Sequence, residues 1–197
     1  MTTPVEPTRR TRVLVTIAVF ALLAVGLFFG VRALIDVAAS QTAAPTPDPT
    51  PTSSSAGFVY VSDDYGYSIE FPAEPTEQSQ TVPAGGAEIE VTSATWDNGK
   101  ASLVSTGARY PARELTDTTA SLQSAVDGLI ANTPNAQLVS SDPATLAGIS
   151  AVKAVISVPA GNLIVVIAID GDVQYQLVAA NLDPTTADGF FATFALA

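Results

Sequence analysis

The sequence predicts an α+β domain built on an antiparallel β-sheet with helices on both faces, an α/β/α sandwich, preceded by one transmembrane helix. Three observations predict it: an apolar run of membrane-spanning length, several short β-rich runs joined by turns, and two segments with helical signals. We expect a cytoplasmic tail over 1–12, a transmembrane helix over 13–35, a Pro/Thr/Ser-rich linker over 36–57 and an extracytoplasmic domain over 58–197.

The apolar run covers residues 13–31 and follows Arg9, Arg10 and Arg12. Because a helix rises about 1.5 Å per residue, this run, continued to residue 35, matches the ~30 Å hydrocarbon core of a bilayer. Arginines before the run favour a cytoplasmic amino terminus, which puts the rest of the chain across the membrane. We therefore expect a single-pass protein of the plasma membrane, held in the lipid bilayer by this helix.

A cleaved secretory signal is the alternative interpretation, because Val37, Ala38 and Ala39 resemble a small-residue cleavage site. The apolar run is longer than the ~7–15 residues of a usual signal core, which favours a retained anchor. Both interpretations imply export. Since the chain has no cysteine, it has neither a lipidated cysteine nor disulfides, and its stability depends on a hydrophobic core.

Composition separates the linker from the domain. Proline occupies alternate positions from Pro45 to Pro51, which favours an extended polyproline II stalk of about 3.1 Å per residue. Beyond the stalk, the chain contains many carboxylates and only four basic residues. Such an acidic surface repels nucleic-acid phosphates. We expect no nucleic-acid partner. The four basic residues are Lys100, Arg109, Arg113 and Lys153.

Short β-rich runs at the start of the domain predict strands over 58–61 and 67–71. The segment between them, 62–66, contains Asp and Gly residues that favour a turn, and Pro72 ends the second strand.

An Asn-Gly pair at 98–99 predicts a β-hairpin between strands over 89–96 and 100–109. A type I′ turn requires positive φ at both central residues, which this pair tolerates best. The turn would place Asp97 opposite Lys100 as an exposed ion pair.

Two helices are predicted. One begins at Thr116 or Asp117 and ends before Pro134. Its apolar residues recur at helical spacing, at Leu122, Ala125, Val126, Leu129 and Ile130. The other begins at Asp183, a capping residue, with Pro184 at its first position. Its core face comprises Phe190, Phe191 and Phe194.

Three central strands lie between the helices, over 148–158, 162–169 and 173–180. The middle strand is apolar at consecutive positions, so both of its faces must be covered, as one helix on each side of an antiparallel sheet would do. The last strand alternates apolar residues with Gln174 and Gln176, the pattern of a half-solvated strand.

Four motifs resemble those of the PsbP-like superfamily. They are Gly-Tyr-Ser-Ile-Glu-Phe-Pro at 66–72, Gly-Ile-Ser-Ala-Val at 148–152, Gly-Asp-Val-Gln-Tyr-Gln-Leu at 171–177 and Phe-Phe-Ala-Thr-Phe at 190–194. The superfamily includes the extrinsic P subunit of photosystem II, a Ran-binding nuclear import factor and many actinobacterial envelope lipoproteins. The resemblance covers nearly all of 58–197 and implies an α/β/α sandwich that binds partners. Unlike the lipoproteins, this chain has no cysteine to lipidate.

The chain contains no histidine and no cysteine. Ser-His-Asp triads, imidazole bases and ordinary zinc ligand sets are therefore excluded, and we expect no metal and no cofactor. A Ser-Lys pair using Lys100 or Lys153, or two carboxylates on facing elements, stay open as catalytic alternatives. Solvated strand lysines are far commoner, so we expect no catalytic residue.

Three features are candidate binding sites. Aspartates at 63–64 and 170–172 have oxygen atoms that suit calcium, although turn formation explains them better. Arg109 and Arg113 lie in one predicted loop, where they could hold an anion or a partner, or bridge to nearby acids in solvent. Four aromatic residues form either a binding face or, as we favour, part of the core. They are Tyr60, Tyr65, Tyr67 and Trp96.

These observations lead to a function hypothesis. We expect a non-catalytic domain of the cell envelope that binds an envelope protein or a cell-wall component. The alternatives are a small-ligand sensor or carrier and, less favoured, a hydrolase that uses carboxylates or a Ser-Lys pair. A pocket lined by two convergent carboxylates would favour the hydrolase, and an exposed apolar patch would favour a partner surface.

Overall fold

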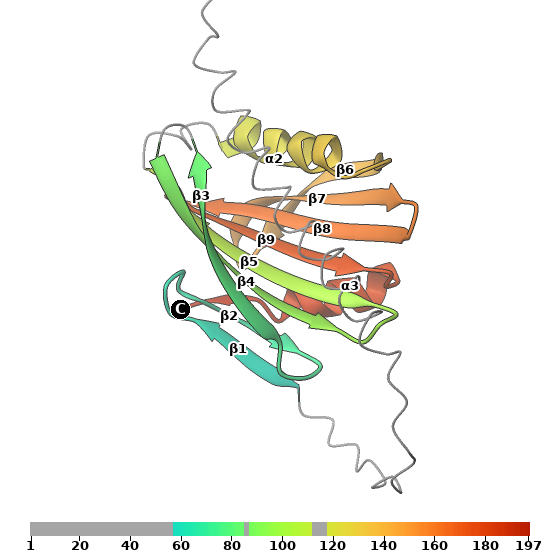
Figure 1. The fold of residues 1–197 in the computed structure, drawn as a ribbon, viewed down its shortest axis with the longest axis horizontal. Helices are drawn as coiled ribbons and strands as arrows, with labels where there is room; N and C mark the ends of the chain where they lie inside the picture. The colour runs from blue at the N-terminus through green and yellow to red at the C-terminus, as the bar shows by residue number, and fades with distance from the viewer. Residues whose placement is uncertain (1–56, 85–86, 112–117) are drawn as a thin grey trace, which may run out of the picture.

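The computed structural model describes residues 57–84, 87–111 and 118–197, and Figure 1 shows its fold. The predicted tail, membrane span and nearly all of the linker lie before residue 57, outside these ranges. The predicted helix-capping residues Thr116 and Asp117 also lie outside them. Across the described ranges, no helix combines the length and the apolar character needed to cross a membrane.

A seven-stranded antiparallel sheet forms the centre of the domain, in the order β3-β4-β5-β9-β8-β7-β6. Its strands are β3 (Thr76–Ala84), β4 (Ala87–Asp97), β5 (Ser102–Arg109), β6 (Gln137–Leu146), β7 (Ile149–Val158), β8 (Gly161–Asp170) and β9 (Val173–Ala180). A three-stranded sheet has the order β1-β2-β10 and contains β1 (Phe58–Ser62), β2 (Tyr67–Phe71) and β10 (Ala195–Leu196). The described helices are α2 (Thr118–Asn132) and α3 (Pro184–Ala192).

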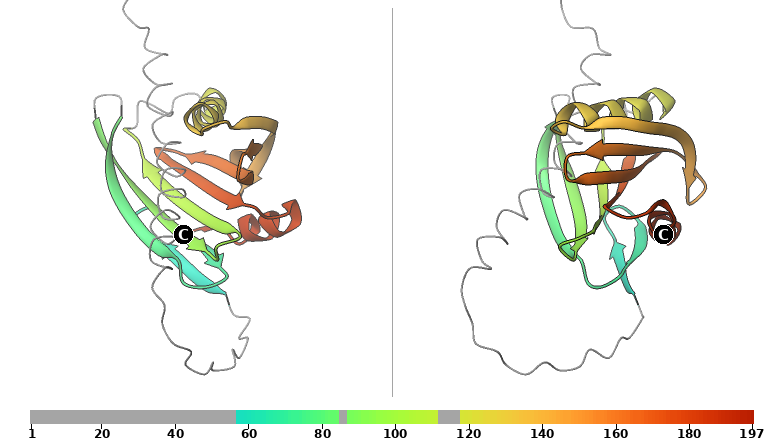
Figure 2. Two further views of the ribbon diagram at one scale, coloured as in Figure 1. Left: turned by 45° about the vertical axis from the view of Figure 1, so that its right-hand side comes forward. Right: turned by 90° about the vertical axis from the view of Figure 1, so that its right-hand side faces the viewer.

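Strand β8 shows why helices lie on both sides of the large sheet. Its alternate residues belong to two separate cores, with Ile164 and Val166 in the core that contains α3, and Leu163 and Val165 in the core that contains α2. In Figure 2 (right), β7 and β8 lie between α2 above and α3 below. We call the two sides of the sheet the α2 face and the α3 face.

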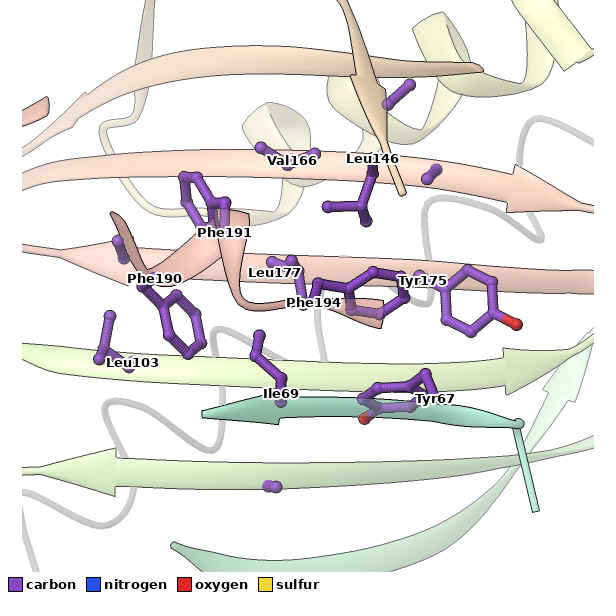
Figure 3. Close-up of a cluster of buried hydrophobic side chains, with 14 of the residues drawn as sticks. Tyr67, Ile69, Leu103, Leu146, Val166, Tyr175, Leu177, Phe190, Phe191 and Phe194 are labelled. Carbon is purple, nitrogen blue, oxygen red and sulfur yellow. The ribbon is translucent and has the colours of Figure 1, made fainter. Parts of the chain in front are cut away.

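Aromatic rings fill the core of the α3 face. Tyr67 of β2 stacks on Phe194 with ring centroids 5.2 Å apart and meets the ring of Tyr175 in β9 edge-on at 5.6 Å. Figure 3 shows these three rings close together. Phe71 of β2 packs against Phe190 of α3 at 5.2 Å. The small sheet is therefore joined to the large sheet by ring contacts.

Helix α3 begins as the sequence predicts. The Asp183 carboxylate accepts a hydrogen bond from the amide of Thr186 at 3.1 Å, and Pro184 occupies the first turn, where its missing amide hydrogen costs nothing. Phe194 follows the end of the helix, yet it is buried in the same core as the two phenylalanines within α3.

The β4–β5 hairpin is confirmed, but the predicted type I′ turn is wrong. Asp97 pairs with Ser102, so the connection has four residues, and of these only Gly99 has positive φ, at 81°. The Asn98 side chain accepts hydrogen bonds from the amides two and three residues later, at 3.0 and 2.9 Å. These bonds stabilise the longer turn. Asp97 accepts a bond from the Gly99 amide at 2.6 Å in place of the expected ion pair with Lys100.

The expected half-solvated character of β9 is also wrong. All of its residues are buried, and Gln174 and Gln176 are only 2% and 3% exposed. Strand β9 is the central strand of the large sheet, between β5 and β8, so both of its faces are covered. The alternation of polar residues does not mark a solvent-facing side here.

The sequence predicts none of β3, β6 and β10. Strands β3 and β6 are the outer strands of the large sheet, and most of their residues are exposed or half-buried, so they show no apolar alternation. They form because their backbone groups hydrogen-bond to those of the neighbouring strands, β3 to β4 and β6 to β7. Strand β10 is only two residues long and pairs with β2.

Candidate functional site

Arg109 lies at the end of β5, where it joins three segments of the chain. Its Nη1 donates to both carboxylate oxygens of Asp172, at 3.1 and 3.2 Å, and its Nη2 donates to the Asp64 carbonyl oxygen at 3.0 Å. Both side chains of this ion pair are exposed, so it adds little stability. Arg113 lies outside the described residues, and a site formed by both arginines stays a prediction.

The two aspartate-containing turns form as turns. Gly66 follows the aspartates at 63–64 with φ of 63°, and Gly171 lies within the 170–172 turn with φ of 58°, a region that favours glycine. Asp172 pairs with Arg109 across the surface. Over the part of the chain that the structure describes, no group of three or more acidic side chains could hold a metal ion.

The aromatic group packs in the core, as favoured. Tyr60, Tyr65 and Tyr67 are buried, and Trp96 is partly buried against the same cluster. The Tyr67 hydroxyl hydrogen-bonds to Ser105 Oγ at 3.1 Å. Burial raises the pKa of Tyr67 to about 12. Burial also raises the pKa of Tyr60, Tyr65 and Tyr175 above the ordinary value.

Gly107 allows Tyr65 to enter this core. A Cβ at position 107 would lie 2.5 Å from Tyr65 Cγ, closer than two carbon atoms can approach. The Tyr65 hydroxyl donates to the Glu90 carbonyl oxygen at 2.9 Å, and Tyr175 donates to the Tyr65 carbonyl oxygen at 2.9 Å. The turn between β1 and β2 is therefore held against β4, β5 and β9.

Neither lysine that could serve a Ser-Lys pair is set in a buried site. Lys153 of β7 forms an ion pair with Asp188 of α3, and so joins the helix to the sheet. Lys100 is exposed in the turn between β4 and β5. Both positions are typical of solvated structural charges.

A buried polar row on the α2 face is a feature that sequence reasoning missed. Ser93, Thr106 and Gln176 stand in register across β4, β5 and β9, and the Ser93 and Thr106 hydroxyls are 3.0 Å apart. Within the described structure, Gln176 Nε2 and Gln174 Oε1 are buried without a hydrogen-bond partner. The alternating glutamines were visible in the sequence, but nothing local indicated that they are buried.

The exposed large apolar side chains of the described residues gather mainly on β1. Val59 is 59% exposed and Val61 is 56% exposed, and we call these two residues, which share one face of the strand, the β1 patch. Phe58, 39% exposed, lies on the other face. Residues 57–99 contain eight carboxylates and no basic side chain. All eight are exposed, namely Asp63, Asp64, Glu70, Glu74, Glu77, Glu88, Glu90 and Asp97. The β1 patch therefore belongs to an acidic segment of the chain.

No protein-family model matches the sequence, and no curated protein matches it. The fold is similar to the solution structure of cyanobacterial PsbP (CyanoP) from Synechocystis sp. PCC 6803, with a TM-score of 0.51 and 11% sequence identity. The similarity covers 78% of this chain and 100% of CyanoP. At that identity the comparison concerns the fold alone. The mostly antiparallel sheet, its two helices and this similarity together identify the domain as PsbP-like in fold.

Proposed function

We propose that this protein is a non-catalytic, membrane-anchored binding domain of the cell envelope. Residues 13–35 form its single transmembrane helix, residues 1–12 stay in the cytoplasm, and the PsbP-like domain is extracytoplasmic. Support comes from the apolar run, the three arginines before it and the proline-rich segment that separates it from the domain. The bilayer is the first partner, and an envelope protein or cell-wall component is the second.

The β1 patch is the observation that carries the binding function. Clustered apolar side chains on a protein surface mark partner contacts more often than scattered ones do. Val59 and Val61 share one face of this short strand, and both are more than half exposed. The strand begins one residue beyond the linker, so the patch lies where the domain emerges from its stalk.

Crosslinking in intact cells, followed by affinity purification of the full chain, tests this proposal. We expect the wild-type protein to capture a stoichiometric envelope partner, and a Val59→Asp/Val61→Asp variant to lose it. The Asp142→Asn variant is the control, because it changes an exposed residue on β6 at the far edge of the large sheet. Recovery of the domain alone from wild-type cells would contradict the proposal. Protease accessibility in intact cells tests the topology.

A small-ligand carrier is the second candidate function, and the buried amides of Gln174 and Gln176 favour it. Their buried atoms Gln174 Oε1 and Gln176 Nε2 have no hydrogen-bond partner among the described residues, and a bound polar molecule would supply one. Native mass spectrometry of the full chain, released from its own membrane, would detect such a molecule as an added mass. An unligated mass throughout would contradict this candidate.

A further inference from the structure

We propose that the outer edge of β1, which pairs with no other strand of the described residues, accepts an extended segment of a partner protein as an added β-strand, and that this segment carries basic side chains. We call this the free edge of β1. The proposal rests on the proposed binding function and names its site and its partner chemistry. Strand addition supplies affinity through backbone hydrogen bonds, while the side chains of alternate residues provide specificity.

The backbone of β1 offers hydrogen-bonding groups on its outer side. The Glu70 amide of β2 donates to Thr193 Oγ1 at 3.0 Å, so it points away from β1. Backbone groups of successive strand residues alternate in direction, so Ile69 bonds to β1, where its register partner is Tyr60. Val59 and Val61, on either side of Tyr60, then direct their N–H and C=O groups to the free edge.

The side chains of β1 suit the same role. Tyr60 is buried, and its hydroxyl donates to the Glu77 carboxylate, which fixes the inner face of the strand. Val59 and Val61 lie on the opposite, outer face and are more than half exposed. Two β-branched residues at alternate positions pack well against side chains of a neighbouring strand. The edge therefore presents both the backbone groups and the side chains that an added strand needs.

The other edge strands of the described structure carry features that discourage pairing. Strand β6 has a register shift between Leu138 and Ser140, and it contains Pro143. Strand β3 contains Pro83, and β10 has only two residues. Prolines, bulges and short lengths are the usual means of protecting a sheet edge. Strand β1 has no proline, no charged residue and no register shift.

Charge selects the occupant. Glu70 stands opposite Val59, and Asp63 and Asp64 follow β1 directly. A second copy of this chain would bring the same carboxylates together, whereas a basic segment would neutralise them. The proline-rich stretch at 45–51 of this chain is unsuited to the edge, because proline has no amide hydrogen to donate.

The test uses the full chain in detergent and a short synthetic peptide of alternating lysine and valine, with a glutamate-valine peptide as the charge control. We expect the lysine peptide to bind and to slow hydrogen exchange of the Val59 and Val61 amides by at least about tenfold. The Val61→Pro variant removes an outward amide and should lower the affinity by about tenfold. The matched Val61→Thr variant keeps that amide and should bind within about threefold of wild type.

Each other outcome overturns the proposal in a distinct way. Peptide binding without slower exchange at Val59 and Val61 would place the site elsewhere. Equal binding of the glutamate peptide would remove the basic specificity. Concentration-dependent dimerisation that protects β1 would make a second copy the occupant. Failure of the lysine peptide to bind, while the full chain still captures a partner in cells, would overturn the edge site and leave the proposed function standing. Hydrogen exchange on the wild-type chain decides the matter even if Val61→Pro fails to fold.

Discussion

Replacing Gln176 with methionine should stabilise the domain. The side chain is 3% exposed, and its Nε2 has no hydrogen-bond partner in the described structure. A buried polar atom left without a partner costs about 1–3 kcal/mol, and methionine keeps the length of the side chain without the amide. At the lower end of that range, we expect the free energy of unfolding to rise by about 1 kcal/mol.

Urea denaturation of the domain over residues 57–197 measures this change, because the single tryptophan, Trp96, packs against the core and reports unfolding. With a slope of about 2 kcal/mol per molar urea, the midpoint should rise by about 0.5 M at unchanged slope. Gln174→Met should act in the same direction. The two substitutions lie two residues apart on one strand face, so their effects need not add.

Gln78→Met is the matched control. Gln78 lies in the same register row, opposite Ser93, but it is exposed, so the same substitution should change the stability by less than about 0.5 kcal/mol. A midpoint for Gln176→Met that falls below wild type would refute the reasoning. It would show that solvent or a bound molecule satisfies the amide in the working protein.

Three further predictions concern the α3 face and the Arg109 ion pair. Gly107→Ala should destabilise the domain by about 1–3 kcal/mol, because the new methyl group meets the Tyr65 ring, and thermal unfolding checks this. Above pH 10 the unfolded chain releases tyrosine protons that the folded chain retains, so stability that is complete below pH 10 falls as the pH rises. Tyr67, whose folded pKa is about 12, alone accounts for a loss of about 2–3 kcal/mol by pH 12, and urea titrations across this range that show no loss would contradict its burial. Arg109→Gln and Asp172→Asn should each change the stability by less than about 1 kcal/mol, as denaturation at low and high salt would show.

Local signals were enough to predict part of the fold. Two adjacent residues, Asp183 and Pro184, are enough to predict where α3 begins. The consecutive apolar residues of β8 likewise predict that both faces of that strand are covered. The polar edge strands were missed because their stability comes from pairing with β4 and β7, which no local window contains. Burial of the two glutamines in β9 likewise depends on the position of that strand at the centre of the sheet.

The candidate site was less predictable, since its contacts are distant in the sequence. Composition identified Arg109, but its partners Asp64 and Asp172 lie 45 and 63 residues away. Strand β1 was predicted as a strand, whereas its place at an edge follows only from the topology. The outward direction of the Val59 and Val61 backbone groups follows from the hydrogen bond between the Glu70 amide and Thr193, a residue 123 positions away in the sequence.

The order of strands in the large sheet divides the chain into two contiguous halves. Strands β3 to β5 follow one another along the chain, as do β6 to β9, and the β5–β9 ladder, from Ser102↔Ala180 to Arg109↔Val173, is the seam between these halves. A cut between residues 111 and 118 leaves each fragment with a complete run of neighbouring strands. Two separately expressed pieces would then meet along this seam, reinforced where β10 returns to β2. The domain therefore suits use as a split protein. If each fragment were fused to one of two other proteins, reassembly of the domain would report that those two proteins are close together.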